Sequence, residues 1–312
     1  MKRRKFLWRS LNTLGISAIA ASFYGVSRTS YLSTKAQALE TTETPTMRVA
    51  AIADFGVGSP DQYAVARAMN QYYQQYPFQT VLMAGDNIYP YGEIRLVHQV
   101  FEKPYAYLLD QGVKFYAALG NHDIINSQNG QDQINYPAFN MSDRYYSFRS
   151  TAKASASNQI ASNNPLVEFF ALDTNSNAPW QEQLQWLEQQ LSMSEAQWKI
   201  VFGHHPLYSS GMHGSNAHLI AMLQPLFAKH QVKIYLCGHD HGYERFVPIN
   251  GTTYIVNGGG GAPLYPFGKS AQTAFVSPQF SFMILDIYPH KIVSKAIAVN
   301  GTVFDQSTIT SS

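Results

Sequence analysis

The chain has 312 residues, of which 45% are hydrophobic and 13% charged. This composition is typical of a globular protein with a large core and excludes a disordered or fibrous chain. The formal net charge is +2, but seven of the 22 lysines and arginines lie in residues 1–38, so residues 39–312 carry 15 bases and 20 acids, a net charge of −5. A mildly acidic folded part argues against a nucleic-acid-binding surface.

The first 38 residues have the features of an export signal. "KRRKFLW" contains paired arginines and resembles a twin-arginine signal, an apolar stretch follows, and "AQA" ends at Ala38 as a small-x-small cleavage pattern. Polar residues such as Asn12 and Ser17 interrupt the apolar stretch, so we expect no stable membrane span in the mature form. A Sec signal and an uncleaved anchor are the alternatives. We predict a signal at 1–38 recognised by the export machinery, cleavage after Ala38, one domain at 39–312, and a periplasmic or secreted protein.

Apolar runs and helical patterns alternate along most of the chain and then give way to strands alone. Predicted strands lie at 48–54, 80–85, 114–120, 166–173, 199–205, 232–238, 252–259, 280–288 and 291–299. Predicted helices lie at 61–76, 95–110, 179–191 and 216–230. This order predicts an α/β fold with a mixed sheet or two packed sheets.

Polar side chains follow five of these predicted strands. They are Asp54; Asp86 and Tyr89; Asn121, His122 and Asp123; His204 and His205; and His239 and His241. In α/β folds the loops after the carboxyl ends of the strands converge, so we expect these side chains to meet. Burying them together is unfavourable unless their charges and lone pairs find partners.

A metal centre supplies such partners. The carboxylates, imidazoles, amide oxygen and phenolate are all oxygen or nitrogen donors, and they are too many for one ion. We therefore predict two divalent or trivalent cations that share a bridging carboxylate. The one cysteine, Cys237, lies inside a predicted strand, where we expect a buried thiol that packs as a small hydrophobe.

The order of Asp54, "GDNIY", "GNHD", "GHHP" and "GHDH" resembles the calcineurin-like metallophosphoesterases. The tyrosine three residues after Asp86 makes the chain similar to the purple acid phosphatases, and most similar to their small tartrate-resistant type. The resemblance runs from about Arg48 to the C-terminus. It implies a four-layer sandwich in which two mixed β-sheets pack face to face between flanking helices.

The resemblance also implies roles for individual residues. Fe(III) would be held by Asp54, Asp86, Tyr89 and His241, and Asp86 would bridge to a second ion, Fe(II), Zn(II) or Mn(II), held by Asn121, His204 and His239. His122 and His213 match the two histidines that contact the substrate. Asp123 either orients His122 or caps a turn. His205 either supports the neighbouring ligand His204 or contacts the substrate.

The implied activity is that of an acid phosphatase. A hydroxide on the two metals would attack a phosphate monoester and release inorganic phosphate. The alternatives are a phosphodiesterase or nucleotide pyrophosphatase with the same dinuclear site, and a metal- or phosphate-binding protein without turnover. A tyrosinate ligand favours ferric iron, so the resemblance also predicts a visible colour that depends on Tyr89.

Overall fold

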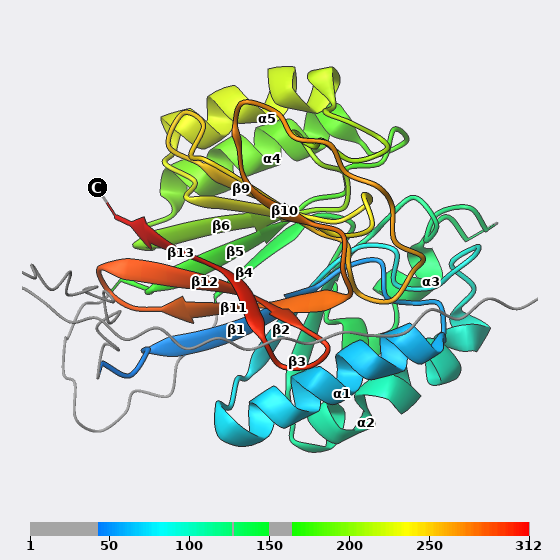
Figure 1. Ribbon diagram of the computed structural model, residues 1–312. Coiled ribbons are helices and arrows are strands. Elements are labelled where there is room, and N and C mark those ends of the chain that lie inside the picture. The colour runs from blue at the N-terminus through cyan, green and yellow to red at the C-terminus, as the bar shows by residue number, and fades with distance from the viewer. Residues whose placement is uncertain (1–42, 127, 150–163, 312) are drawn as a thin grey trace, which may run out of the picture. The chain divides into compact units, whose positions relative to one another are not determined.

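The computed structural model describes residues 43–126, 128–149 and 164–311 (Figure 1). All helices and strands reported below belong to one compact unit, which begins at Thr44. The predicted export signal at 1–38 lies outside the described residues, so both the signal and the cleavage after Ala38 stay predictions. No helix in the described part of the chain is both long and apolar enough to cross a membrane.

The first sheet has six strands in the order β13-β12-β11-β1-β2-β3. Its strands are β1 (Met47–Ile52), β2 (Thr80–Ala84), β3 (Lys114–Ala118), β11 (Ser281–Ile287), β12 (Lys291–Ala298) and β13 (Val303–Thr310). Strands β1, β2 and β3 run parallel, whereas β11, β12 and β13 extend the sheet by antiparallel pairing from β1. The carboxyl ends of β1 and β2 therefore lie side by side at one edge of the sheet.

The second sheet has seven strands in the order β10-β8-β9-β7-β6-β5-β4. They are β4 (Tyr146–Arg149), β5 (Val167–Ala171), β6 (Trp198–Phe202), β7 (Ile234–Cys237), β8 (Tyr243–Phe246), β9 (Thr253–Asn257) and β10 (Thr273–Ser277). Strands β5, β6, β7 and β9 form its parallel centre. Both sheets are thus mixed, and the site motifs follow parallel strands, of which β3 lies at an edge and the others lie inside.

Helices cover the outer faces of the two sheets, α1 and α2 on the first and α4 and α5 on the second (Figure 1). Their bounds, with those of the shorter helical turns, are α1 (Pro60–Gln75), η1 (Ile94–Leu96), η2 (His98–Glu102), α2 (Lys103–Asp110), α3 (Gln131–Ile134), η3 (Pro137–Phe139), α4 (Trp180–Met193) and α5 (Ala217–Lys229). The predicted four-layer arrangement of helices and two facing sheets is confirmed.

The predicted helix at 95–110 is helical over its length, but its first half is not an α-helix, because the 3₁₀ turn η1 and the π turn η2 precede α2. Pro104 explains the change of helix type. Proline has no N–H, so the carbonyl of Val100, four residues earlier, receives no helical hydrogen bond. The side-chain amide of Gln62, from α1, donates to that carbonyl instead.

Alternate residues of the central strands face two different hydrophobic clusters, because successive side chains of a strand point to opposite faces. Phe169 of β5 and Ile200 of β6 pack with the first sheet, whereas the next residues, Phe170 and Val201, pack with α4 and α5. This explains why these strands are continuous apolar runs. Cys237 is buried in the second cluster, as predicted.

Four strands were not predicted, namely β4, β8, β10 and β13. Strands β4, β10 and β13 lie at sheet edges, and β13 alternates exposed polar residues with a few buried ones. Edge strands bury little apolar surface of their own, so their sequences lack the apolar run that marks a central strand.

Candidate metal centre

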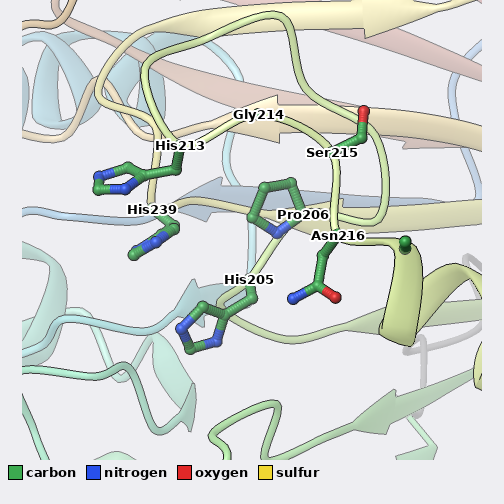
Figure 2. Close-up of a pocket in the computed structure, with 8 residues that line it drawn as sticks. His205, Pro206, His213, Gly214, Ser215, Asn216 and His239 are labelled. Atoms are coloured by element: carbon green, nitrogen blue, oxygen red, sulfur yellow. The ribbon is translucent and has the colours of Figure 1, made fainter.

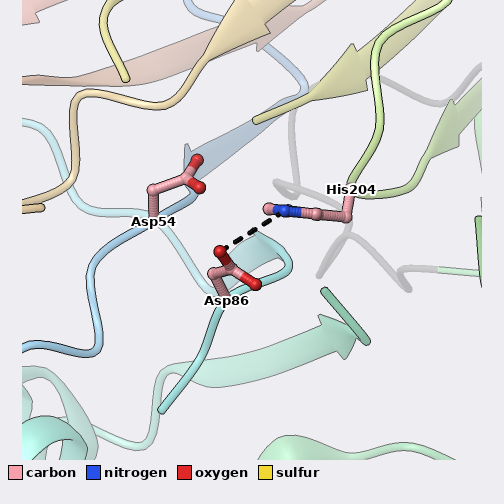
Figure 3. A group of neighbouring side chains, drawn as sticks. All are labelled: Asp54, Asp86 and His204. Atoms are coloured by element: carbon pink, nitrogen blue, oxygen red, sulfur yellow. Dashed lines mark ion pairs between the residues drawn. The ribbon is translucent and has the colours of Figure 1, made fainter. Parts of the chain in front are cut away.

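Five strand ends deliver the side chains of the site, and four of them do so with the same offset. Asp54, Asp86, His204 and His239 each lie two residues beyond the last residue of β1, β2, β6 and β7, respectively. The carboxyl ends of the two sheets meet here, so Asp54, Asp86 and His204 point at one another (Figure 3). One ligand atom from each of these three buried residues lies within 4.8 Å of the other two.

The backbone at these positions adopts conformations that side chains usually avoid. Asp54, Asp86 and His239 have φ values of 56°, 52° and 70°, in the left-handed region. Such a conformation costs about 1–2 kcal/mol per residue and is concentrated at functional sites. A Cβ on Gly120 would lie 2.2 Å from Oδ1 of Asp86, so only glycine permits this close approach of the two loops.

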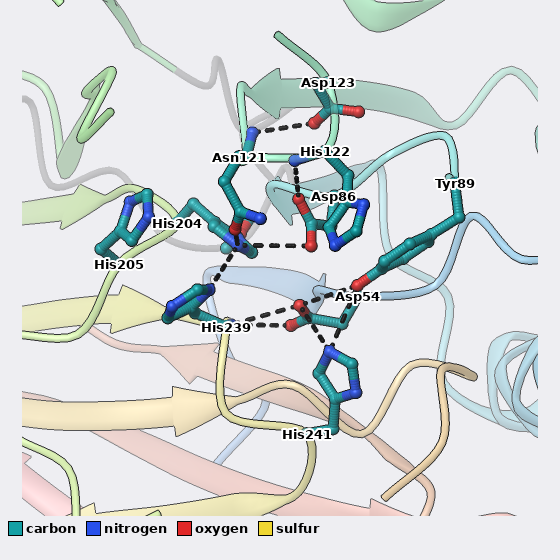
Figure 4. A network of polar contacts seen from close by, with 12 residues as sticks. Asp54, Asp86, Tyr89, Asn121, His122, Asp123, His204, His205, His239 and His241 are labelled. Carbon is teal, nitrogen blue, oxygen red and sulfur yellow. Dashed lines mark hydrogen bonds and ion pairs between the residues drawn. The ribbon is translucent and has the colours of Figure 1, made fainter. Parts of the chain in front are cut away.

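Tyr89 and His241 converge on Asp54 (Figure 4). The phenol oxygen of Tyr89 lies 3.2 Å from Oδ1 of Asp54 and 3.3 Å from Nε2 of His241, which is itself 3.5 Å from Oδ1 of Asp54. Nδ1 of His241 lies 2.7 Å from the carbonyl oxygen of Pro263 and donates its proton there, so Nε2 presents a lone pair to the cluster.

A second cluster lies on the other side of Asp86. Nε2 of His204 is 3.5 Å from Oδ2 of Asp86, 2.9 Å from Oδ1 of Asn121 and 3.2 Å from Nδ1 of His239. Nδ1 of His204 lies 3.0 Å from the carbonyl oxygen of Ala84 and donates a hydrogen bond to it, so Nε2 of the neutral imidazole bears a lone pair. Lone-pair-bearing atoms so close together repel one another unless a cation lies among them.

The ionisation of these groups also points to a cation. Burial raises the pKa of the Tyr89 phenol well above its usual value, and the charges of Asp54 and Asp86 act in the same direction. Burial and the neighbouring His204 lower the pKa of His239, which keeps its imidazole neutral. A neutral imidazole is a metal ligand, and a buried phenol becomes a ligand when a cation stabilises its phenolate. The donor set therefore fits two hard or borderline cations on either side of Asp86.

The two predicted substrate histidines flank these clusters. His122 donates from Nδ1 to the carbonyl oxygen of Pro90 at 2.7 Å, and its ring lies beside Tyr89 with ring centroids 4.5 Å apart. The ring of His213 stacks on His239 with centroids 4.0 Å apart. One histidine therefore stands beside each cluster, as a substrate lying across both clusters requires.

Asp123 caps turns and does not hold the His122 ring in the described contacts. Its carboxylate accepts the backbone N–H groups of Gly120 at 2.8 Å, Asn87 at 3.0 Å and Ile88 at 3.1 Å. Burial raises the pKa of Asp123 to about 6, with the Asp86 charge acting in the same direction and the donors opposing it. This carboxylate joins the loop of Asp86 to the loop of Asn121.

Two residues that support the site were missed by the sequence reasoning. Thr174, after β5, accepts the backbone N–H groups of His204 and His205 at its hydroxyl oxygen. Asp240 accepts the Ser209 hydroxyl at 2.5 Å and the His213 backbone N–H at 2.9 Å, which ties the His213 loop to the metal-binding segment. Both residues follow strand ends, so the rule that found the other polar residues applies to them as well.

A cavity of about 280 Å³ opens beside the second cluster (Figure 2). It is lined by His205, Pro206, His213, Gly214, Ser215, Asn216, Ala217 and His239. These residues belong to the loop after β6, the first turn of α5 and the loop after β7. The cavity therefore adjoins the clusters on the side where His213 stands.

Comparison with known proteins decides the family. Residues 47–243 match the family model described as calcineurin-like phosphoesterase. The chain belongs to the calcineurin-like phosphoesterase family. Membership of this phosphoesterase family makes the protein a hydrolase, and the matched span contains every residue of the two clusters.

Individual relatives and solved structures are also similar to this chain. The chain is 29% identical over 248 residues to the tartrate-resistant acid phosphatase type 5 of Oryctolagus cuniculus, with 70% of this chain and 74% of the relative covered. Its fold is similar to that of GAP50, the anchor in the inner membrane complex of Plasmodium (TM-score 0.72, 23% identity, 85% of this chain and 88% of that one). It is also similar to the purple acid phosphatase PPD1 from yellow lupin, Lupinus luteus (TM-score 0.62, 21% identity, 85% of this chain and 53% of that one).

Proposed function

We propose that the protein is an exported acid phosphatase that hydrolyses phosphate monoesters at a dinuclear metal centre. The observation that carries this proposal is the pair of donor clusters that share Asp86, with one exposed or half-buried histidine beside each cluster. The tartrate-resistant acid phosphatase relative supports the reaction. The N-terminal pattern supports export to the periplasm or the medium.

In this proposal Asp54, Asp86, Tyr89 and His241 would hold Fe(III), and Asp86 together with Asn121, His204 and His239 would hold a second ion, Fe(II), Zn(II) or Mn(II). The two cations would supply an activated water for the attack and would draw charge from the phosphoryl oxygens. The protein orients the histidine donors by hydrogen bonds from the other ring nitrogen, that of His204 to the carbonyl of Ala84 and that of His241 to the carbonyl of Pro263.

His122 and His213 act on the substrate in this proposal. Because Nδ1 of His122 is held by Pro90, its Nε2 is the nitrogen that can face a phosphoryl oxygen. His213 stands on the opposite side, next to the cavity that would receive the leaving group. A protonated imidazole can stabilise the negative charge that develops on the phosphoryl oxygens, and one of the two can protonate the leaving oxygen.

Metal analysis combined with a comparison of two substrates tests the function. We expect the purified mature protein to retain two metal ions per chain and to hydrolyse p-nitrophenyl phosphate faster than bis(p-nitrophenyl) phosphate. Asp86→Asn should remove metal and activity together, because a carboxylate oxygen of Asp86 lies within 4.8 Å of ligand atoms of both Asp54 and His204. The matched control is Asp110→Asn, a change at an exposed carboxylate at the end of α2.

The other outcomes have definite meanings. Faster hydrolysis of the bis ester would show that the protein is a phosphodiesterase that uses the same clusters, and would refute the assignment as a monoesterase. Two retained metal ions without hydrolysis of either ester, from acid to neutral pH, would refute both enzymes and leave a binding protein.

A further inference from the structure

His205, the second histidine of "GHHP", lines the cavity beside the second cluster but belongs to neither cluster (Figures 2 and 4). Its ring packs against His204 and His239, with centroids 5.0 and 4.6 Å apart. Its Nδ1 lies 2.9 Å from the hydroxyl oxygen of Thr174. The Nε2 atom has no hydrogen-bond partner among the described residues.

The hydrogen bonds of Thr174 determine which nitrogen of His205 carries the proton. The Thr174 hydroxyl oxygen accepts the backbone N–H of His204 at 3.2 Å and that of His205 at 2.9 Å. A hydroxyl has two acceptor lone pairs and one donor hydrogen, so both lone pairs are used. The remaining hydroxyl hydrogen points to Nδ1 of His205, which must accept it. The ring proton therefore lies on Nε2, and the imidazole offers an N–H donor on the side away from Thr174.

Histidine is the only titratable residue type that lines the cavity of His205. Its polar side chains are those of His205, His213, Ser215, Asn216 and His239, and none of its lining residues is Lys, Arg, Asp or Glu. Asn216 uses its side-chain oxygen to accept the N–H groups of His218 and Leu219 at the start of α5. Within this lining, His205 is thus a fixed N–H donor held by a second residue.

We propose that His205 determines the leaving-group specificity of the enzyme, by donating from Nε2–H to a hydrogen-bond acceptor on the alcohol part of the substrate. This rests on the proposed phosphatase function. With the phosphoryl group at the two clusters, the alcohol part extends into the cavity next to His213. The preferred substrates are then phosphate esters of small polar alcohols, such as polyols, over esters whose leaving group has no acceptor beyond the ester oxygen.

Steady-state kinetics with two esters test the specificity. Glycerol 2-phosphate carries hydroxyl acceptors in its leaving group, whereas phenyl phosphate carries none. We expect His205→Leu to lower kcat/KM for glycerol 2-phosphate about three- to tenfold, the range for one net hydrogen bond, and to change that for phenyl phosphate less than about twofold. His205→Gln, which places an amide N–H near the original Nε2, should restore most of the loss.

The matched control is His218→Leu, a change at an exposed histidine in the first turn of α5. We expect this change to leave kcat/KM unaltered for both esters. Equal losses for both esters in His205→Leu would place the contact on the phosphoryl group and overturn the inference, and no loss for either would do the same. In both cases the parent still hydrolyses the esters, so the proposed function stands. A parent that hydrolyses neither ester overturns the function and the inference together.

The tautomer can be measured without activity. In ¹⁵N spectra of histidine-labelled protein loaded with zinc alone, the signal lost in His205→Gln should have the shifts of a protonated Nε2 and a bare Nδ1. Thr174→Val should change that signal, whereas Thr174→Ser, which keeps the hydroxyl, should preserve it. A proton on Nδ1 in the parent would refute the donor assignment whatever the kinetics.

Discussion

Replacing Asp123 by alanine tests whether this carboxylate holds the two loops of the metal centre. The change removes the acceptor of three backbone N–H groups, those of Gly120, Asn87 and Ile88, for which no other acceptor exists among the described residues. The side-chain donors that also contact Asp123 keep second acceptors. A buried donor left without a partner costs about 1–3 kcal/mol, so three of them predict a loss of at least about 3 kcal/mol in the free energy of unfolding.

Urea unfolding of chelator-treated protein, followed by circular dichroism, measures this loss without the contribution of metal binding to stability. Asp110→Ala, at an exposed position, serves as the control and should change the free energy of unfolding by less than about 0.5 kcal/mol. Metal retention should also weaken, because the freed N–H groups flank Asp86 and Asn121 in the chain. A loss below about 1 kcal/mol in Asp123→Ala would refute the reasoning.

Three further predictions concern the centre and its surroundings. Tyr89→Phe should remove the visible absorbance of iron-loaded protein while keeping the fold, and an unchanged absorption spectrum would contradict a tyrosinate ligand. Asp240→Ala should lower kcat about tenfold with metal content unchanged, because the loop of His213 loses its anchor; metal loss in proportion to activity would contradict this. Arg144→Met should destabilise the protein by about 3 kcal/mol in urea unfolding, since it leaves Asp173 buried without its cation, whereas Arg95→Met, at an exposed pair with Glu93, should cost less than about 1 kcal/mol. Similar costs for the two arginines would contradict the burial argument.

Most of the central fold could be predicted from the sequence, because burial on both faces leaves a continuous apolar run in each central strand. The strands β1, β2, β5, β6, β7 and β9 are recognisable in this way. Strands β4, β10 and β13 are not, since an edge strand is stabilised by pairing with a neighbour that the local sequence does not identify. The side-chain pattern predicted the helix at 95–110 but not its change from a π turn to an α-helix, which follows from the missing N–H of Pro104.

The candidate ligands were also predictable. Each follows the end of a predicted strand, and burying polar side chains there is unfavourable unless a cation or another partner pairs with them. Which nitrogen of each histidine faces the centre was decided only by the tertiary structure. The carbonyl groups of Ala84 and Pro263 accept hydrogen bonds from His204 and His241, and the Thr174 hydroxyl donates one to His205, through contacts between residues 22 to 120 positions apart. A tautomer depends on the acceptor or donor that the fold brings to the other ring nitrogen, and the residue type alone does not specify it.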